Sequence, residues 1–339
     1  MTVSQPWTPA WIPERAAAVP PPPRPRYKLA LALLGLTFLC CTTFSPAIYL
    51  WSRTDVQTDL VPFPSPEMVL RVWRDPDLLR LGLSFSIPVL LILFAHEMGH
   101  YIACRRYGLS ATLPYFLPVP AMFGTLGAFI RIRSPIRNKR ELFDVGIAGP
   151  LAGFVVLLPF LFYGIARSEP AILDPGPAGS SLLVPGRCLA IQLATLLFHG
   201  RLGEGMTLNL HPFALAAWFG LLATALNLIP LGQFDGGHIL YAVSGRWQRR
   251  LAPLLWVGLG LAGFRWPGWW LWSLIALAIG LFHPVVRNEA EPLDPRRRGL
   301  AVVALIVLIL SFTPQAITEV SSAPLPERGT GMMVSLTPR

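Results

Sequence analysis

The segment Ser86-Ile-Pro-Val-Leu-Leu-Ile-Leu-Phe-Ala-His-Glu-Met-Gly-His100 places an H-E-x-x-H pattern at the end of one of the most apolar runs of the chain. Ionisable side chains within an apolar, membrane-spanning segment are costly and are functional by default. On a helix His96 and His100 lie on the same face, one turn apart, so both imidazoles can reach one metal ion. Because this pattern is one that holds zinc, the segment predicts a metal site inside a hydrophobic helix.

Glu97 follows the first histidine and lies roughly 100° further around the helix. It is therefore placed beside the metal ion, where a general base that deprotonates a water molecule belongs. A soluble helix could carry the same pattern by chance on a solvated face. The neighbours Phe94, Ala95, Tyr101 and Ile102 leave no such face here. We therefore predict that Glu97 is catalytic and that one zinc ion is bound per chain.

The composition indicates a membrane protein. The 339 residues are 53% hydrophobic and 14% charged, whereas soluble proteins average about 25% charged residues. We expect an all-α polytopic membrane protein with about seven transmembrane helices, at residues 29–51, 79–104, 143–166, 212–231, 251–264, 267–282 and 300–312. Prolines and glycines interrupt residues 113–132, which predicts a re-entrant, β-hairpin-like segment that lines a cavity or packs on protein.

The ends of the chain differ from its apolar body. Residues 1–27 are polar and rich in proline, which predicts a disordered cytoplasmic tail. Residues 28–317 are expected to form the transmembrane metalloprotease domain, with a catalytic core at about 79–250. Residues 318–339 are expected to be a C-terminal tail.

Lys and Arg residues orient the chain. The net charge of +10 comes largely from clusters that border the apolar spans, at residues 24–28, 105–106, 131–140, 246–250 and 287–298. If the N-terminus is cytoplasmic, every cluster lies on the cytoplasmic side, as the positive-inside rule requires. The H-E-x-x-H pattern then lies toward that side. Nucleic acids also attract such charge, but the clusters border membrane spans, so no nucleic-acid partner is expected.

We expect an integral protein of a bacterial cytoplasmic membrane. No transit peptide is apparent in the sequence, and a plastid membrane is the alternative compartment.

A second motif follows the fourth expected span and reads Asn227-Leu-Ile-Pro-Leu-Gly-Gln-Phe-Asp235-Gly-Gly-His238. A catalytic zinc site needs three protein ligands and an open position. The second and fourth expected spans run in the same direction, so Asp235 reaches the depth of His96 and His100 and is predicted as the third ligand. The alternative is that Asp235 caps a helix that begins near His238.

The two motifs together resemble the site-2 protease family of intramembrane metalloproteases, which joins H-E-x-x-H on one membrane helix to N-x-x-P-x-x-x-x-D-G on a later one. Both patterns are matched here at His96, Glu97, His100, Asn227, Pro230, Asp235 and Gly236. Residues 124–130 and 149–153 also look like family segments, and the resemblance covers roughly residues 79–250. The chain departs from the family at Phe234, where many members have Leu, and at residues 232–233, where some have prolines.

The resemblance implies hydrolysis of a peptide bond in or near a transmembrane segment. The expected partners are a membrane-protein substrate with a transmembrane helix and the lipid bilayer. A helical substrate must unwind locally, and the edge that contains Gly124 and Gly127 could receive it as an added strand. In the family the motif Asn is thought to hold the substrate backbone, which suggests this role for Asn227. Asn227 could equally form hydrogen bonds with the unpaired backbone groups at the end of a broken helix.

Many family members carry a soluble PDZ domain between their third and fourth spans. Residues 167–210 are too few for such a domain, so we expect a short form without one. Two other functions remain open. One is a catalytically silent homologue that acts as a membrane chaperone or adaptor, although the intact Glu97 argues against it. The other is an ion transporter, because intramembrane His, Glu and Asp also build ion paths, although the sequence shows no internal repeat.

Overall fold

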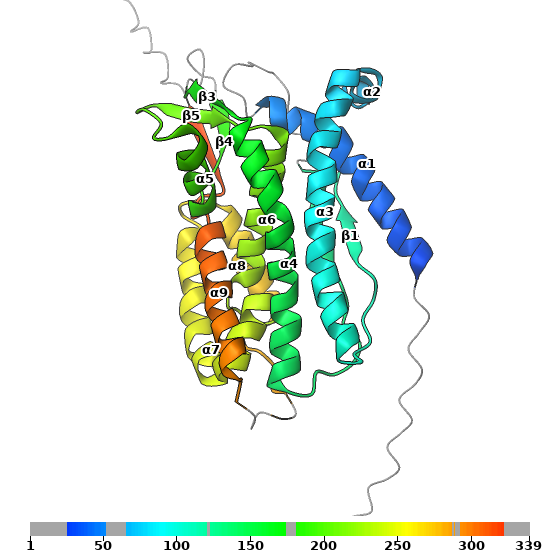
Figure 1. Ribbon diagram of the computed structural model, residues 1–339, viewed down its shortest axis with the longest axis vertical. Helices are drawn as coiled ribbons and strands as arrows, with labels where there is room; N and C mark the ends of the chain where they lie inside the picture. The colour runs from blue at the N-terminus through cyan, green and yellow to red at the C-terminus, as the bar shows by residue number, and fades with distance from the viewer. Residues whose placement is uncertain are drawn as a thin grey trace, which may run out of the picture.

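The computed structural model describes residues 26–51, 66–120, 123–173, 181–286, 288 and 292–321. Most of these residues are helical, and short strands pair at three places (Figure 1). The elements in chain order are α1 (Tyr27–Trp51), α2 (Pro66–Arg74), α3 (Pro76–Arg106), β1 (Tyr115–Pro118), β2 (Thr125–Phe129), α4 (Lys139–Ala166), β3 (Glu169–Ile172), β4 (Ser181–Pro185), α5 (Leu189–His199), β5 (Met206–Asn209), α6 (Pro212–Leu228), α7 (Asp235–Ala262), α8 (Gly268–Ile279), α9 (Pro295–Ser311) and β6 (Ile317–Ser321).

Three helices, α1, α3 and α4, are long and apolar enough to cross a membrane. Polar caps define where two of them begin. The Asp75 carboxylate accepts hydrogen bonds from the first backbone N–H groups of α3, and the Asn138 side chain accepts one at the start of α4. The helices α5, α6 and α8 are apolar but shorter. Length and composition thus support three of the seven expected spans, and the remaining four stay predictions.

The helix that follows the second motif differs from the sequence-based expectation. A helix beginning near His238 was the alternative context for Asp235, and a separate span was expected at 251–264. Helical residues instead begin at Asp235 and extend to Ala262. This element, α7, consists of two helical segments that meet at a kink, where Ser244 has non-helical backbone angles. Its two early glycines allow close packing and do not break it. A Cβ atom at Gly236 would lie 2.0 Å from the carbonyl oxygen of Leu228.

The segment 113–132 contains an antiparallel hairpin. Strands β1 and β2 pair Tyr115 with Phe129 and Pro118 with Thr125, and the register shifts between these pairs. Gly127 lies on β2 beside this irregularity with φ of 114°, a conformation that favours glycine. The hairpin packs against α1 and α3. Its insertion into a membrane as a re-entrant segment stays a prediction.

The expectation of an all-α protein missed two further strand pairs. Strand β3 pairs with β5, and β4 pairs with β6, both antiparallel. Each strand has only four or five residues, and each partner lies beyond at least one intervening helix in the sequence. Local residue patterns carry little information about such non-local pairing. Strand β6 also continues past residue 317, where we expected the domain to end.

The helix α4 is central to the fold and packs against α3, α6 and α7. Helices α3 and α4 approach closely because small residues face each other. A Cβ atom at Gly99 would lie 2.3 Å from the carbonyl oxygen of Ala148, as is typical of close helix pairs in membranes. Large side chains that include Phe85, Leu157 and Trp218 are fully buried around this pair. The rigid contact between α3 and α4 positions the residues of the H-E-x-x-H pattern.

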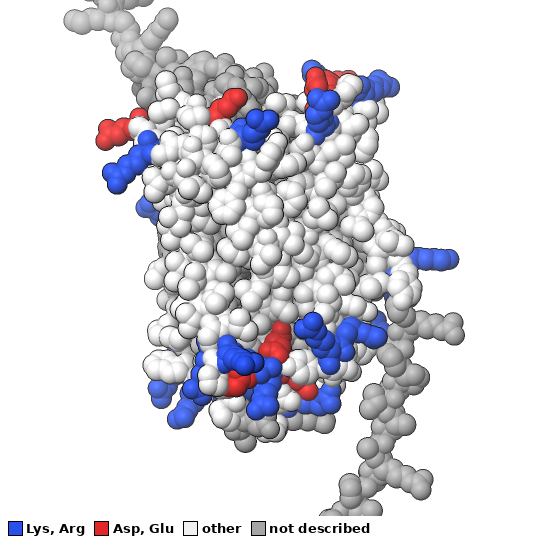
Figure 2. Space-filling model, viewed as in Figure 1, with Lys and Arg blue, Asp and Glu red and all other residues white. Residues whose placement is uncertain are grey.

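The charged residues lie at the two ends of the molecule. Figure 2 shows Lys, Arg, Asp and Glu gathered at both ends, with few charges on the band between them. The end where α3 stops and α4 and α9 start is the more basic, as Figures 1 and 2 together show. This distribution is the one expected of a helical membrane protein. The assignment of the basic end to the cytoplasm stays a prediction.

Candidate metal centre

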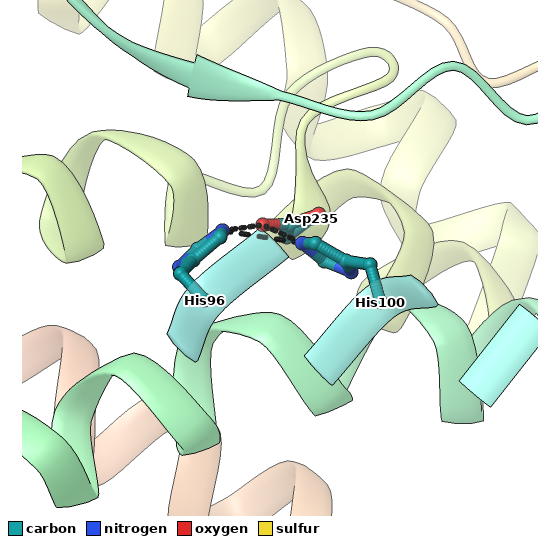
Figure 3. A group of neighbouring side chains, drawn as sticks. All are labelled: His96, His100 and Asp235. Atoms are coloured by element: carbon teal, nitrogen blue, oxygen red, sulfur yellow. Dashed lines mark hydrogen bonds and ion pairs between the residues drawn. The ribbon is translucent and has the colours of Figure 1, made fainter. Parts of the chain in front are cut away.

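Three predicted ligand residues meet at one point inside the fold. Figure 3 shows His96 and His100 from α3 pointing toward Asp235, the first residue of α7. The Nε2 atoms of His96 and His100 lie 3.1 Å apart. Asp235 Oδ2 lies 3.3 Å from His96 Nε2 and 3.4 Å from His100 Nε2. Thus residues separated by more than a hundred positions place three donor atoms within 4.8 Å of one another.

The spacing of these donor atoms suits zinc. Ligand atoms about 2.0–2.2 Å from a tetrahedral zinc ion lie about 3.3–3.5 Å from one another. The three separations of 3.1, 3.3 and 3.4 Å are close to that range. Two imidazole nitrogens and one carboxylate oxygen are also a donor set typical of catalytic zinc. The residues present therefore fit a zinc ion with one coordination position left open.

A backbone carbonyl sets the orientation of the His100 ring. His100 Nδ1 lies 2.7 Å from the carbonyl oxygen of Val145 on α4. A carbonyl can only accept, so Nδ1 carries the proton and donates it. The lone pair of Nε2 then points toward His96 and Asp235. Hydrogen bonds of this kind fix the tautomer of metal-binding histidines and increase their basicity.

Two glycines on α4 make room for the histidines on α3. A Cβ atom at Gly149 would lie 2.1 Å from His100 Nε2, and one at Gly153 would lie 3.2 Å from the His96 Cβ. The glycines are four residues apart on α4, as the histidines are on α3, so the two helices present matching faces. Residues 149–153 stood out in the sequence as a family-like segment, but their contact with the histidines was not predicted.

We expect Gly149→Ala to reduce zinc affinity by about 10–100-fold, the usual effect of disturbing a residue that supports a metal ligand. The added methyl group overlaps the His100 ring, so the ring must rotate and lose its hydrogen bond to Val145. Zinc affinity would be measured by titration against a chelator of known affinity. Gly258→Ala is the matched control, because a Cβ atom there meets no atom within 4 Å. Equal zinc affinity in both variants would contradict the prediction.

The start of α7 decides between the two interpretations of Asp235. The N-cap position of α7 is occupied by Phe234, and the helix begins at Asp235 itself. The alternative of a capping residue for a helix near His238 is therefore wrong. The Asp235 side chain is 14% exposed and contacts both histidines. This placement supports the ligand role predicted from the sequence.

Glu97 lies next to the three donor residues. It is 6% exposed, and its carboxylate interacts electrostatically with both histidines and with Asp235. The Ile130 backbone, just beyond the end of β2, lies near this carboxylate. Glu97 thus lies between the donor triangle and the hairpin. A carboxylate in this position can exchange protons with a water molecule or an amine at the centre.

Comparison with known proteins decides the family. Residues 84–256 match the model of Peptidase family M50, which is the site-2 protease family. The chain belongs to peptidase family M50. The match contains His96, Glu97, His100, Asn227 and Asp235.

Plant proteins are among the relatives of this M50 chain. It is 32% identical over 267 residues to the "Probable zinc metalloprotease EGY2, chloroplastic" of Oryza sativa subsp. indica, a match that covers 74% of the chain and 47% of the relative. The protein of the same name from Arabidopsis thaliana is 29% identical, with 73% and 44% covered. The "Probable zinc metalloprotease EGY1, chloroplastic" of Oryza sativa subsp. japonica is 27% identical, with 85% and 50% covered. The chain spans about half the length of these relatives.

Of the predicted substrate-binding residues of this M50 chain, one is explained by close packing and two are not. Gly124 packs against the backbone of α1, where a Cβ atom would lie 2.3 Å from the Cys41 nitrogen, so close packing explains this glycine. Gly127, by contrast, borders open space. Asn227 lies in the last turn of α6 and is half-buried. Its side-chain amide makes no hydrogen bond to the described residues. This part of the structure therefore does not support the alternative in which Asn227 pairs with backbone groups at the end of a broken helix.

The sequence analysis missed an ionic cluster that anchors α9 near the metal centre. Arg297 donates from Nε to Asp144 Oδ1 at 2.8 Å and from Nη2 to Asp144 Oδ2 at 2.5 Å. Tyr107, directly after α3, donates to the same carboxylate. Burial and then Asp144 raise the pKa of the Tyr107 phenol, so it remains a donor. Asp144 precedes Val145, whose carbonyl orients His100. The cluster therefore ties α9 to the α4 turn that supports the ligand.

A second histidine pair lies beside the centre and also escaped prediction. His238 Nδ1 lies 2.7 Å from His283 Nε2, and His283 Nδ1 donates to the Pro284 carbonyl at 2.6 Å. The Tyr241 ring stacks on His283. His283 lies 45 residues after His238, and no spacing rule connects them. Only the packing of α7 against the segment after α8 brings this pair together.

Proposed function

We propose that this chain is a zinc metallopeptidase that hydrolyses a peptide bond in or near a transmembrane segment of a substrate protein. The observation that carries the proposal is the donor triangle of His96, His100 and Asp235 with Glu97 beside it, all enclosed by apolar helices. Membership of family M50 and the names of the relatives support zinc as the metal. The proposed ligands are His96, His100 and Asp235, with one zinc ion per chain.

The charges of the proposed centre balance. His100 donates Nδ1–H to the Val145 carbonyl, so as a zinc ligand it would bind through the Nε2 lone pair and add no charge. The carboxylates of Asp235 and Glu97 together match a divalent cation. A neutral ensemble is the least costly arrangement for ionisable groups in a low-dielectric interior. Zinc, when bound, supplies a Lewis acid that polarises the scissile carbonyl and makes water acidic enough to lose a proton near neutral pH.

Separate residues of this chain have separate roles in hydrolysis. The Glu97 carboxylate accepts a proton from the attacking water and donates it to the leaving amine. The open space beside Gly127 on β2 receives the unwound substrate as an added strand. The Asn227 amide, which makes no hydrogen bond to the described residues, binds the substrate backbone. Because Glu97 lies near Ile130, which directly follows β2, a strand bound there would reach the base that acts on it.

The proposed setting is an integral membrane position with the N-terminus in the cytoplasm and the centre toward the cytoplasmic side. The basic end of the molecule supports this orientation through the positive-inside rule. A bacterial cytoplasmic membrane is the proposed compartment. The relatives carry the word chloroplastic in their names, which makes a plastid membrane the alternative. The proposed partners are a substrate with a transmembrane helix and the bilayer, without nucleic acid.

Hydrolysis by the full chain in lipid nanodiscs tests the proposal. We expect a co-reconstituted protein with one transmembrane helix to be cut within or beside its apolar segment, with the new termini located by mass spectrometry. A zinc chelator should stop the reaction, and added zinc should restore it, because the ligands arise from the folded centre. A soluble, extended peptide serves as the control substrate. Cleavage of that peptide alone would contradict the intramembrane part of the proposal.

The alternatives predict different results in the same system. A silent homologue acting as a chaperone or adaptor would bind zinc and leave every membrane substrate intact. A transporter would move zinc or protons across the membrane of proteoliposomes at a rate that does not depend on Glu97 as a base. Zinc or proton flux that persists in the Glu97→Gln variant, without any proteolysis, would favour the transporter and contradict the peptidase proposal.

A further inference from the structure

A cleft opens where α3 ends, away from the metal centre. It has a volume of about 340 Å³ and lies between the last turns of α3, the loop that follows them and the base of the hairpin. Its lining includes Arg26, Arg105 and Arg133, together with Tyr101 and Tyr115. Among the described residues that line it there is no Asp or Glu. The cleft therefore combines concentrated positive charge with two aromatic walls.

The three guanidinium groups come from three separate segments. Arg26 directly precedes α1, Arg105 lies in the last turn of α3, and Arg133 follows β2. All three residues are exposed, and all three line this one cleft. The planar fork of arginine matches the geometry of phosphate oxygens and binds them more specifically than a point charge does. This chemistry points to a phosphate group as the ligand.

The position of the cleft favours a lipid as the source of that phosphate. One of its walls is the last part of α3, which is long and apolar enough to cross a membrane and ends at the more basic end of the molecule, and Arg26 in the lining directly precedes the apolar helix α1 (Figures 1 and 2). Anionic lipid headgroups occupy this level of a bilayer, and basic pockets there bind them. Ile102, which directly follows Tyr101 on α3, is an apolar side chain that is 48% exposed. Acyl chains can lie against it.

We propose that this cleft binds the phosphate headgroup of an anionic phospholipid. The ligand would join two parts of the catalytic body. On one wall, Tyr101 directly follows His100. On the other, residues 110–112 pair with residues 131–133 at the base of the hairpin. There Thr112 N donates to the Arg131 carbonyl at 3.0 Å, and Arg133 N donates to the Ser110 carbonyl at 2.7 Å. A bound headgroup therefore holds the proposed substrate strand and the metal-binding helix in a fixed relation.

The test measures lipid binding by the purified full chain. Protein in mixed micelles is titrated with phosphatidylglycerol or phosphatidylcholine, and retained lipid is counted by native mass spectrometry. We expect selective retention of phosphatidylglycerol by the unmodified chain. Each cationic side chain near the membrane surface contributes about 1 kcal/mol, so Arg105→Gln with Arg133→Gln should weaken binding by about thirtyfold. Arg249→Gln with Arg250→Gln removes the same charge from an exposed part of α7 outside the cleft and should weaken binding much less than the cleft pair does.

Two further measurements test the role of the guanidinium groups and distinguish a lipid phosphate from free inorganic phosphate. Arg105→Lys with Arg133→Lys keeps the positive charge but removes the planar guanidinium fork. This variant should therefore bind the lipid more weakly than the unmodified chain and more tightly than the glutamine pair. Inorganic phosphate in excess should fail to displace the lipid, because it lacks the acyl chains. Displacement by inorganic phosphate would overturn the lipid source. Equal retention by both glutamine pairs, with zinc content and gel-filtration profile unchanged, would overturn the cleft as the site.

Discussion

Replacement of Glu97 by Gln is expected to leave zinc bound and to lower peptide-bond hydrolysis by about 10²–10⁴-fold, the usual contribution of a general base. Glutamine has nearly the shape of glutamate, so the packing around this buried side chain is preserved. Its amide cannot accept a proton from water at neutral pH. Because Glu97 lies outside the donor triangle, His96, His100 and Asp235 remain in place. Zinc content by elemental mass spectrometry and cleavage rates in nanodiscs would be measured on the same preparation.

The control for this substitution is Glu67→Gln, which makes the same chemical change at an exposed position on α2. It should leave both zinc content and cleavage unchanged. In cells, Glu97→Gln should also accumulate uncut membrane proteins that co-purify with it, because binding survives while hydrolysis stops. A Glu97→Gln protein that cleaves at the rate of the unmodified chain would remove Glu97 from the proposed mechanism.

Replacement of His96 by Ala is expected to remove zinc and activity together. It deletes one of the three donor atoms and leaves Asp235 with a single imidazole partner. Loss of a residue that merely supports a ligand already costs about 10–100-fold in metal affinity, so loss of the ligand itself should exceed about 100-fold. The purified variant should contain zinc at background level and show no cleavage above that of chelator-treated protein.

His199→Ala controls for the loss of an imidazole elsewhere. His199 ends α5 and hydrogen-bonds the Ile165 carbonyl, away from the donor triangle. This variant should keep full zinc content, with a stability loss of about 1 kcal/mol from the missing hydrogen bond. The ligand assignment would fail if His96→Ala retained stoichiometric zinc. Together, Glu97→Gln and His96→Ala separate a residue that acts on the substrate from one that holds the metal.

The site was more predictable than the fold. The pair His96 and His100 follows from the helical period alone, and Glu97 follows from its place in that period. Asp235 required an argument about membrane depth, and its contacts with both histidines agree with that argument. The fold was harder because the strands β3 to β6 are short and find their partners across long stretches of chain.

The sequence by itself determined which side chains can bind a metal, because spacing along one helix sets the relative directions of neighbouring residues. The tertiary structure alone decided how those side chains are held. Val145 orients His100 through a carbonyl on α4, and Gly149 leaves the space that the His100 ring fills. Arg297 reaches the same turn of α4 from α9. Such contacts depend on how separate helices pack against one another, and no periodicity within a single segment encodes which backbone atom a side chain from another segment will meet.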